Sequence, residues 1–173
     1  MMKKSLLVGL IALSAIGVRS SEVPLFRISG LTFDFHKTWS LSAGKSSMTK
    51  ASMTYLIDGK PTGPSADFLH FGQGQGGGVQ ANLDRWKKQF QGSPTTKEET
   101  RKVGERSWHF VRIDGTFLKG RPFGPKAPVA DQRMLGAIVE DAGGTVFVKL
   151  VDGQAAVSEA VEKAFIKLIE SAL

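Results

Sequence analysis

The chain of 173 residues contains no cysteine. This absence excludes disulfide frameworks, thiolate metal sites, cysteine nucleophiles and lipid attachment through cysteine. Histidine is scarce as well, and the spacing of His36, His70 and His109 matches no metal-binding motif, such as two histidines one helical turn apart. No serine stands in a G-x-S-x-G motif, which marks one large class of hydrolases. The sequence therefore predicts no catalytic residues, no metal site and no cofactor.

Apolar runs are short throughout, and the longest lies next to the N-terminus. Leu6–Ile16 follows a short basic stretch and precedes small residues around Gly17 and Ser20. This arrangement is typical of a secretory signal peptide, here residues 1–20. Because a membrane span needs about 20 apolar residues, an uncleaved N-terminal anchor is the less favoured alternative. We expect a protein that is exported to the periplasm or the extracellular space and is soluble after cleavage.

The remaining residues, 21–173, have the composition of one globular domain. Apolar residues make up 41% of the chain and charged residues 23%, an ordinary balance for a folded protein. No repeat or long linker divides this region, and its length suffices to bury a core without disulfides. Export disfavours cytosolic cofactors such as ATP and NAD. The sequence thus predicts a signal peptide followed by a single domain.

Apolar residues that alternate with polar ones predict a series of strands. The predicted strands are 31–36, 51–57, 67–71, a polar edge strand at 95–103, 108–113, 134–139 and 145–151, of which the last two form a hairpin. The serine-rich stretch 40–47 and the proline-containing stretch 118–130 are predicted as loops. A turn is expected at Asp114-Gly115.

Two segments show the periodicity of amphipathic helices, 79–91 and 155–172. Strands joined by hairpins indicate an antiparallel sheet, and each helix needs a face to cover. The predicted fold class is α+β, with a single, mostly antiparallel, twisted sheet of about six strands and two amphipathic helices packed on it.

Several motifs resemble those of a group of exported, uncharacterised bacterial proteins with a PsbP-like fold. The resemblance covers 30–173 and rests on Gly30-Leu-Thr-Phe-Asp-Phe with Trp39, Phe71-Gly72 and the glycines after it, Asn82-x-x-Arg85-Trp86-x-x-Gln89-Phe90, Arg133–Glu140 and Phe147–Leu150. The resemblance implies an antiparallel sheet with helices on its faces, and a binding or assembly role of the kind this fold has in photosystem subunits and in a nuclear-import regulator. A shared fold by itself carries no function.

The glycine-rich loop Gly72–Gly78 is the first candidate binding site. It precedes a predicted helix, where free main-chain N–H groups favour an anion. Its G-x-G-x-x-G spacing lacks the parallel βαβ context that a dinucleotide requires, so a flexible structural crossover is the favoured alternative. The candidate ligand-binding residues are Gln73, Gly74, Gln75, Gly76, Gly77, Gly78, Asn82 and Arg85. A purely structural interpretation would have Asn82 bind the loop backbone and Arg85 pair with a carboxylate of the sheet.

Basic residues are concentrated in the segment 85–133, which holds twelve bases against five acids. Lys119, Arg121 and Lys126 lie there in one loop with two phenylalanines, Phe117 and Phe123. Such a pattern is compatible with an anionic partner, while an ordinary solvated surface is the favoured alternative. Nucleic acid is disfavoured by export, and peripheral contact with a membrane surface is compatible with it.

These observations favour an exported, non-enzymatic binding or assembly module of the cell envelope. Its partner would be an anionic envelope component or another protein. The alternative is an enzyme that acts on an envelope polymer, or a small-anion receptor that uses the Gly72–Gly78 loop.

The signal peptide yields a direct prediction. Cleavage should follow Gly17 or Ser20, because small residues there succeed the apolar run. N-terminal sequencing of the protein from its native envelope fraction checks this. A mature protein that retains Met1 would contradict the prediction.

Overall fold

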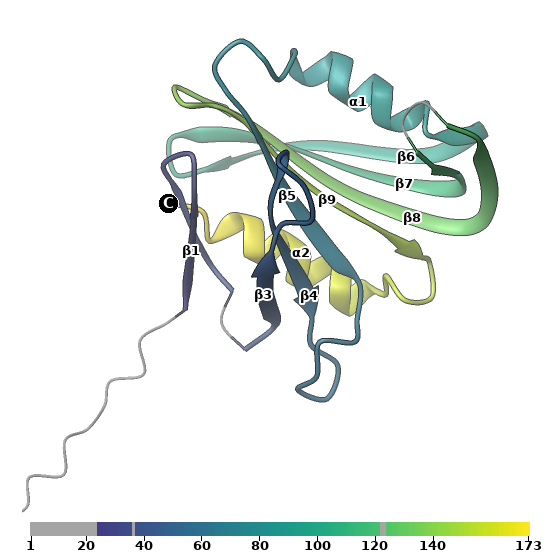
Figure 1. The fold of residues 1–173 in the computed structure, drawn as a ribbon, viewed down its shortest axis with the longest axis horizontal. Coiled ribbons are helices and arrows are strands. Elements are labelled where there is room, and N and C mark those ends of the chain that lie inside the picture. The colour runs from purple at the N-terminus through teal and green to yellow at the C-terminus, as the bar shows by residue number, and fades with distance from the viewer. Residues whose placement is uncertain (1–23, 36, 122–123) are drawn as a thin grey trace, which may run out of the picture.

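The computed structural model describes residues 24–35, 37–121 and 124–173, so the predicted signal peptide, His36 and Phe123 lie outside the described residues. Within these residues, strands and two helices follow one another along the chain (Figure 1). They are β1 Leu25–Ile28, β2 Leu31–Asp34, β3 Trp39–Ala43, β4 Thr49–Tyr55, β5 Ser65–Phe71, α1 Val79–Lys87, β6 Phe90–Val103, β7 Arg106–Gly120, β8 Lys126–Asp141, β9 Gly144–Gly153 and α2 Glu159–Glu170. Neither helix is long and apolar enough to cross a membrane.

Seven strands form one antiparallel sheet in the order β3-β4-β5-β9-β8-β7-β6, and β1 pairs with β2 in a separate hairpin. The chain builds β3 to β5 by hairpins and crosses through α1 to the opposite edge. It then returns by hairpins until β9 pairs with β5. The predicted α+β class is therefore confirmed, as are the β8–β9 hairpin and the edge position of β6.

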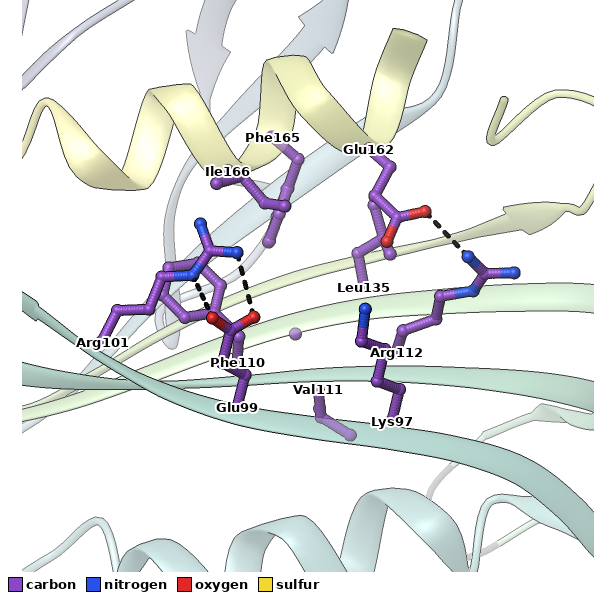
Figure 2. A pocket seen from close by; sticks show the side chains of 11 residues that line it. Lys97, Glu99, Arg101, Phe110, Val111, Arg112, Leu135, Glu162, Phe165 and Ile166 are labelled. Atoms are coloured by element: carbon purple, nitrogen blue, oxygen red, sulfur yellow. Dashed lines mark hydrogen bonds and ion pairs between the residues drawn. The ribbon is translucent and has the colours of Figure 1, made fainter. Parts of the chain in front are cut away.

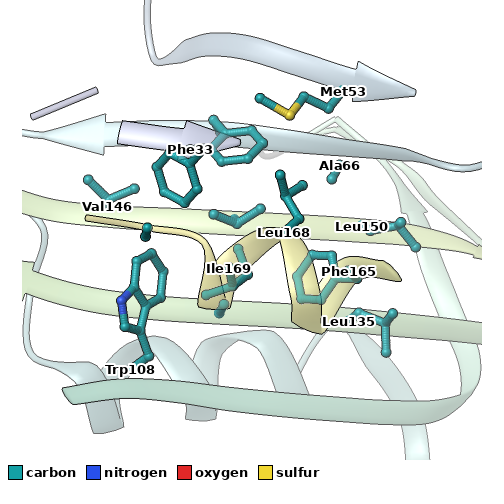
Figure 3. Packing of buried hydrophobic residues seen from close by; sticks show 14 of the residues in the cluster. Phe33, Met53, Ala66, Trp108, Leu135, Val146, Leu150, Phe165, Leu168 and Ile169 are labelled. Carbon is teal, nitrogen blue, oxygen red and sulfur yellow. The ribbon is translucent and has the colours of Figure 1, made fainter. Parts of the chain in front are cut away.

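Helix α2 and the β1–β2 hairpin cover one face of the sheet. Phe165, Leu168 and Ile169 of α2 are buried in an apolar cluster to which all seven strands contribute. Figure 3 shows part of this cluster, with Met53, Ala66 and Leu150 among its strand residues. Phe33 of β2 makes edge contacts with the rings of Phe68 and Trp108, at centroid distances of 5.1 and 6.1 Å. The C-terminus closes this layer, because the main chain of Leu173 exchanges two hydrogen bonds with Thr32 of β2.

Helix α1 covers only part of the opposite face. Its buried residues Leu83 and Trp86 pack on β7, β8 and β9, where the second apolar cluster lies. Gly136 of β8 allows this approach, since a Cβ atom there would overlap the Trp86 ring. No residue of β3 or β4 belongs to this cluster. On this face α1 therefore leaves β3 and β4 uncovered, whereas Leu69 and Phe71 of β5 still pack against the α1 cluster.

Two local predictions are wrong, and one strand has no counterpart among the predictions. The stretch 40–47 was expected to be a loop, but β3 occupies Trp39–Ala43 because its small residues pair with β4 at the sheet edge. Strand β1 carries no clear alternation and was not predicted. The helix expected over 79–91 ends at Lys87, and Phe90 begins β6 while still packing in the α1 cluster.

The predicted turn at Asp114-Gly115 and the predicted loop 118–130 are also wrong. Strand β7 continues past a bulge between Gly115 and Phe117, and β8 begins at Lys126. Pro128 lies within β8 opposite Leu118. A strand tolerates proline at a position where no neighbouring strand would accept a hydrogen bond from the main-chain N–H that proline lacks. Strand β9 pairs with β8 only from Gln132 onward, so β8 has a free side at Pro128.

The contact between Trp86 and Gly136 can be tested by stability. Trp86→Ala should lower the free energy of unfolding by about 3–5 kcal/mol, as expected for a large core truncation. Gly136→Ala should also destabilise, because the added methyl group collides with the indole. In the Trp86→Ala background the same glycine substitution should cost clearly less. Urea unfolding of the four proteins measures this, and strictly additive effects would contradict the packing described.

Candidate functional site

The structure places the glycine-rich loop between β5 and α1, beside the β8–β9 turn. Gly74 and Gly77 have φ angles of +73° and +71°, which favour glycine. Gly76 is buried, and a Cβ atom there would lie 2.6 Å from Oγ1 of Thr145 on β9. These three positions need glycine for backbone conformation or close approach. The loop therefore has a structural reason for its composition.

Asn82 fixes this loop to the helix. Its side chain is 2% exposed, and its Nδ2 atom donates to the carbonyl oxygens of Gly76, Gly77 and Gly78 at 2.9, 3.3 and 3.0 Å. Buried polar groups normally find such partners. The structure thus gives Asn82 the loop-binding role that was the alternative to ligand binding.

Arg85 is exposed and makes no ion pair among the described residues. It does not pair with a sheet carboxylate, although its guanidinium lies beside Gly77. The shallow hollow along the loop also includes Glu140 and Asp141, and Asp141 is already paired with Arg106 at 3.2 Å. Two carboxylates at this hollow oppose the binding of an anion by the loop.

A groove between α2 and strands β6 and β7 is lined by charged side chains above an apolar floor (Figure 2). Arg101 pairs with Glu99 and with Glu170 of α2, each at 2.7 Å, and Arg112 pairs with Glu162 of α2 at 3.0 Å. Figure 2 shows Lys97 between these pairs, and Lys97 has no ion-pair partner among the described residues. The groove encloses about 60 Å³, well below the ~300–1,000 Å³ typical of small-molecule sites.

Arg112 also belongs to a partly buried charge cluster centred on Asp114. Arg133 and Arg112 contact its carboxylate at 2.7 and 2.8 Å, and Arg133 also donates to the carbonyl oxygen of Val157, just before α2. Burial alone would raise the pKa of Asp114, but hydrogen bonds from the two arginines outweigh it and lower the pKa below its usual value. The cluster attaches α2 to the sheet and is structural.

The bases of the segment 85–133 do not form one positive face. Lys87, Arg101, Arg106, Arg112 and Arg133 are neutralised by acids, several of which come from outside the segment. The unpaired bases include four exposed residues where α1 ends and the β7–β8 hairpin turns. We call this group the basic end, and it consists of Lys88, Lys119, Arg121 and Lys126.

The two described histidines have partners within the sheet region. His70 Nε2 lies 3.1 Å from the carbonyl oxygen of Gly143, and His109 Nδ1 lies 3.0 Å from Oγ1 of Thr100. Neither is placed beside a serine hydroxyl and a carboxylate in the manner of a hydrolase triad. Among the described residues, no three His, Asp or Glu side chains gather to hold a metal ion.

Sequence reasoning did not single out Lys149, whose amine lies partly buried on β9. Burial lowers its pKa to about 8, and Asp67 opposes this only in part. The sequence does contain a signal for a buried cation, because Lys149 is the one charged residue within the apolar run 145–151. The groove residues Lys97 and Glu162 were missed because only the tertiary fold brings β6 and α2 together.

Comparison with known proteins defines the fold but not a family. No protein-family model matches the sequence, and no curated protein matches it. The solution structure of cyanobacterial PsbP (CyanoP) from Synechocystis is similar, with a TM-score of 0.57 over 91% of this chain and 95% of that chain, at 11% sequence identity. The chain therefore has a PsbP-like fold, as the sequence resemblance implied. At this identity, the similarity shows the fold alone.

The roles of Asn82 and Arg85 are separable by mutation. Asn82→Ala should lower the free energy of unfolding by about 1–3 kcal/mol, because three loop carbonyls lose their buried donor. Arg85→Ala should change it by less than about 0.5 kcal/mol, as expected for an exposed side chain. Asn82→Asp keeps the shape but places a carboxylate oxygen against the three carbonyl oxygens, so it should destabilise at least as much as Asn82→Ala. Thermal and urea unfolding measure these effects, and a strongly destabilised Arg85→Ala would contradict the assignment.

Proposed function

We propose that this protein is an exported, non-enzymatic binding module of the cell envelope that docks on an anionic surface through its basic end. The observation that carries the proposal is a cluster of four exposed cations without counter-ions. Lys88, Lys119, Arg121 and Lys126 make no ion pair among the described residues. The segment 115–130 contains no acidic residue at all.

Tertiary contacts support the clustering of these four cations. The main-chain N–H of Leu118 donates to the carbonyl oxygen of Gln89 at 2.8 Å. The rings of Phe90 and Phe117 pack edge to face at 5.3 Å. These contacts join the end of α1 to the β7–β8 hairpin, so that Lys88 lies next to Gln89 and Lys119 next to Leu118. The remaining two bases flank the hairpin turn.

Lipid headgroups are the anionic surface we favour. Exposed lysine and arginine near an anionic membrane each contribute about 1 kcal/mol of binding free energy. Phe117 packs on Phe90 rather than pointing outward, so the interaction should be electrostatic and not insertion of a ring into the bilayer. The alternative role, an enzyme or small-anion receptor built on Gly72–Gly78, finds less support because Glu140 and Asp141 flank that loop.

Sedimentation with lipid vesicles tests the proposal. Vesicles with 30% phosphatidylglycerol should bind the mature protein at low salt, and pure phosphatidylcholine vesicles should not. Raising the salt concentration should weaken binding steeply, because exposed charges are screened within about 10 Å at 0.1 M. The triple variant Lys119→Gln, Arg121→Gln and Lys126→Gln should bind about 100-fold more weakly, which corresponds to roughly 1 kcal/mol for each base.

The matched control is Lys37→Gln, Lys60→Gln and Lys102→Gln, which removes the same charge from exposed positions elsewhere. The proposal requires that this control bind clearly better than the hairpin variant. Equal losses would mean that net charge alone is responsible. Binding to a soluble polyanion such as polyglutamate but not to vesicles would reassign the partner to an envelope polymer.

A further inference from the structure

The half of the sheet face that α1 leaves uncovered is lined by polar residues. On β4 and β5, Ser52, Thr54, Ser65 and Asp67 alternate with the apolar residues that face α2. Ser52 donates to Asp67, and the hydroxyls of Thr54 and Ser65 lie 2.8 Å apart. Ser52 is only 2% exposed. These side chains form a hydrogen-bonded polar surface rather than scattered solvated groups.

Lys149 of β9 adds a cation to this surface without a counter-ion in contact. It lies opposite Asp67 in the β5–β9 register, yet no carboxylate comes within 4 Å of its amine among the described residues. The amine donates to Oε1 of Gln89 and lies 5.6 Å from the centre of the Phe117 ring. Asp67 acts on the amine only from a distance, so part of the cost of removing this ammonium group from water is left uncompensated.

A hollow of about 340 Å³ is lined in part by the side chain of Lys149. Its lining includes the second cation Lys45, the hydroxyl of Ser65, and the carboxylates of Asp67 and Asp152. Both carboxylates already have donors, because Asp67 accepts from Ser52 and Asp152 accepts from the main-chain N–H of Gly153. Among the described residues neither cation has an ion-pair partner. The hollow thus places two such cations beside two carboxylates, a mixed lining that suits a ligand with both a carboxylate and hydroxyl groups.

We propose that this hollow binds a small hydroxylated carboxylate, a sugar acid in its chemistry, with Lys149 and Lys45 at the carboxylate. The hydroxyl of Ser65 and the remaining acceptor capacity of Asp67 suit the ligand's hydroxyl groups, which donate as well as accept. The volume lies near the lower end of the ~300–1,000 Å³ of ligand sites, which fits a single sugar ring. This site lies apart from the basic end, and the proposal does not depend on vesicle binding.

Binding of an anion to Lys149 has a consequence for its proton. The amine has a pKa of about 8 in the free protein, and an adjacent carboxylate favours its charged form. Asp67 is the charged group that acts on this amine from β5, whereas Gln89 and Phe117, which contact it from the α1–β6 junction and β7, are uncharged. Ligand binding near pH 8 should therefore take up protons, and binding at pH 6 should not.

Isothermal titration calorimetry with D-glucuronate as the probe tests the site. The wild-type protein should bind glucuronate at least tenfold more tightly than glucose, which lacks the carboxylate, and than acetate, which lacks the hydroxyls. At pH 8 the measured enthalpy should vary with the ionisation enthalpy of the buffer, because protons are taken up, and at pH 6 this dependence should disappear. A parallel titration with an oligomer of the same acid tells a free sugar acid from a unit of a polymer.

Variants identify the residues responsible. Lys149→Met keeps the side-chain length and should weaken glucuronate binding at least tenfold and abolish the buffer dependence. Lys45→Gln, at an exposed position, should weaken binding severalfold without affecting folding. Lys102→Gln is the control for charge removed at a distance. The proposal is overturned if the wild type does not bind glucuronate at millimolar concentrations, if glucose binds equally well, or if Lys45→Gln and a folded Lys149→Met bind like the wild type.

Discussion

One face of the seven-stranded sheet packs against α2 and the β1–β2 hairpin in a single apolar core. Every strand contributes at least one residue to that core, from Trp39 on β3 to Val103 on β6. Because side chains alternate along a strand, this single contact also determines which residues face the other way. On β4 and the first part of β5 the residues so directed include Ser52, Thr54, Ser65 and Asp67. Further along they are apolar, with Leu69 and Phe71 on β5 and Ile113, Met134 and Ile138 on β7 and β8. The second face is thus divided into a polar half and an apolar half before α1 is considered.

The length of α1 matches that division. Nine residues, with Leu83 and Trp86 on the buried side, cover the apolar half and no more. Gly136 lets the Trp86 ring of α1 pack closely on β8, and Gly76 lets the glycine loop pack closely on β9. In this packing Asn82 is buried and donates to the loop carbonyls. Lys149 stands at the boundary between the halves. Its stem is among apolar neighbours while its amine reaches Gln89, and this position is the cause of its lowered pKa.

Alternation was sufficient to predict most strands of the sheet, because burial of one face imposes a period of two. It failed at β3, whose Ser-Leu-Ser-Ala sequence reads as a loop and becomes a strand only through its pairing with β4. Proline and glycine misled the prediction for 118–130, where the free side of β8 removes the usual penalty for Pro128. The candidate site at the glycine loop could be proposed from the sequence because all of its residues lie within one short segment, 73–85. The hollow beside Lys149 joins residues from the β3–β4 turn, β5 and β9, and no local pattern relates those segments.

The net charge of a sequence segment did not predict the charge of the surface that the segment forms, because tertiary contacts bring acids from other segments next to its bases. Arg101 and Arg112 belong to the basic segment, but α2 supplies the acids that neutralise them. Tertiary contacts decide which bases stay without an ion-pair partner, and these include the bases of the basic end and the two lysines of the hollow beside Lys149. Gln89 touches both, since its side chain accepts from Lys149 and its main-chain carbonyl accepts from Leu118 of the hairpin. Because that one residue supports both surfaces, a substitution at Gln89 would not separate the two proposed interactions, whereas Lys45 and Lys126 belong to one surface each.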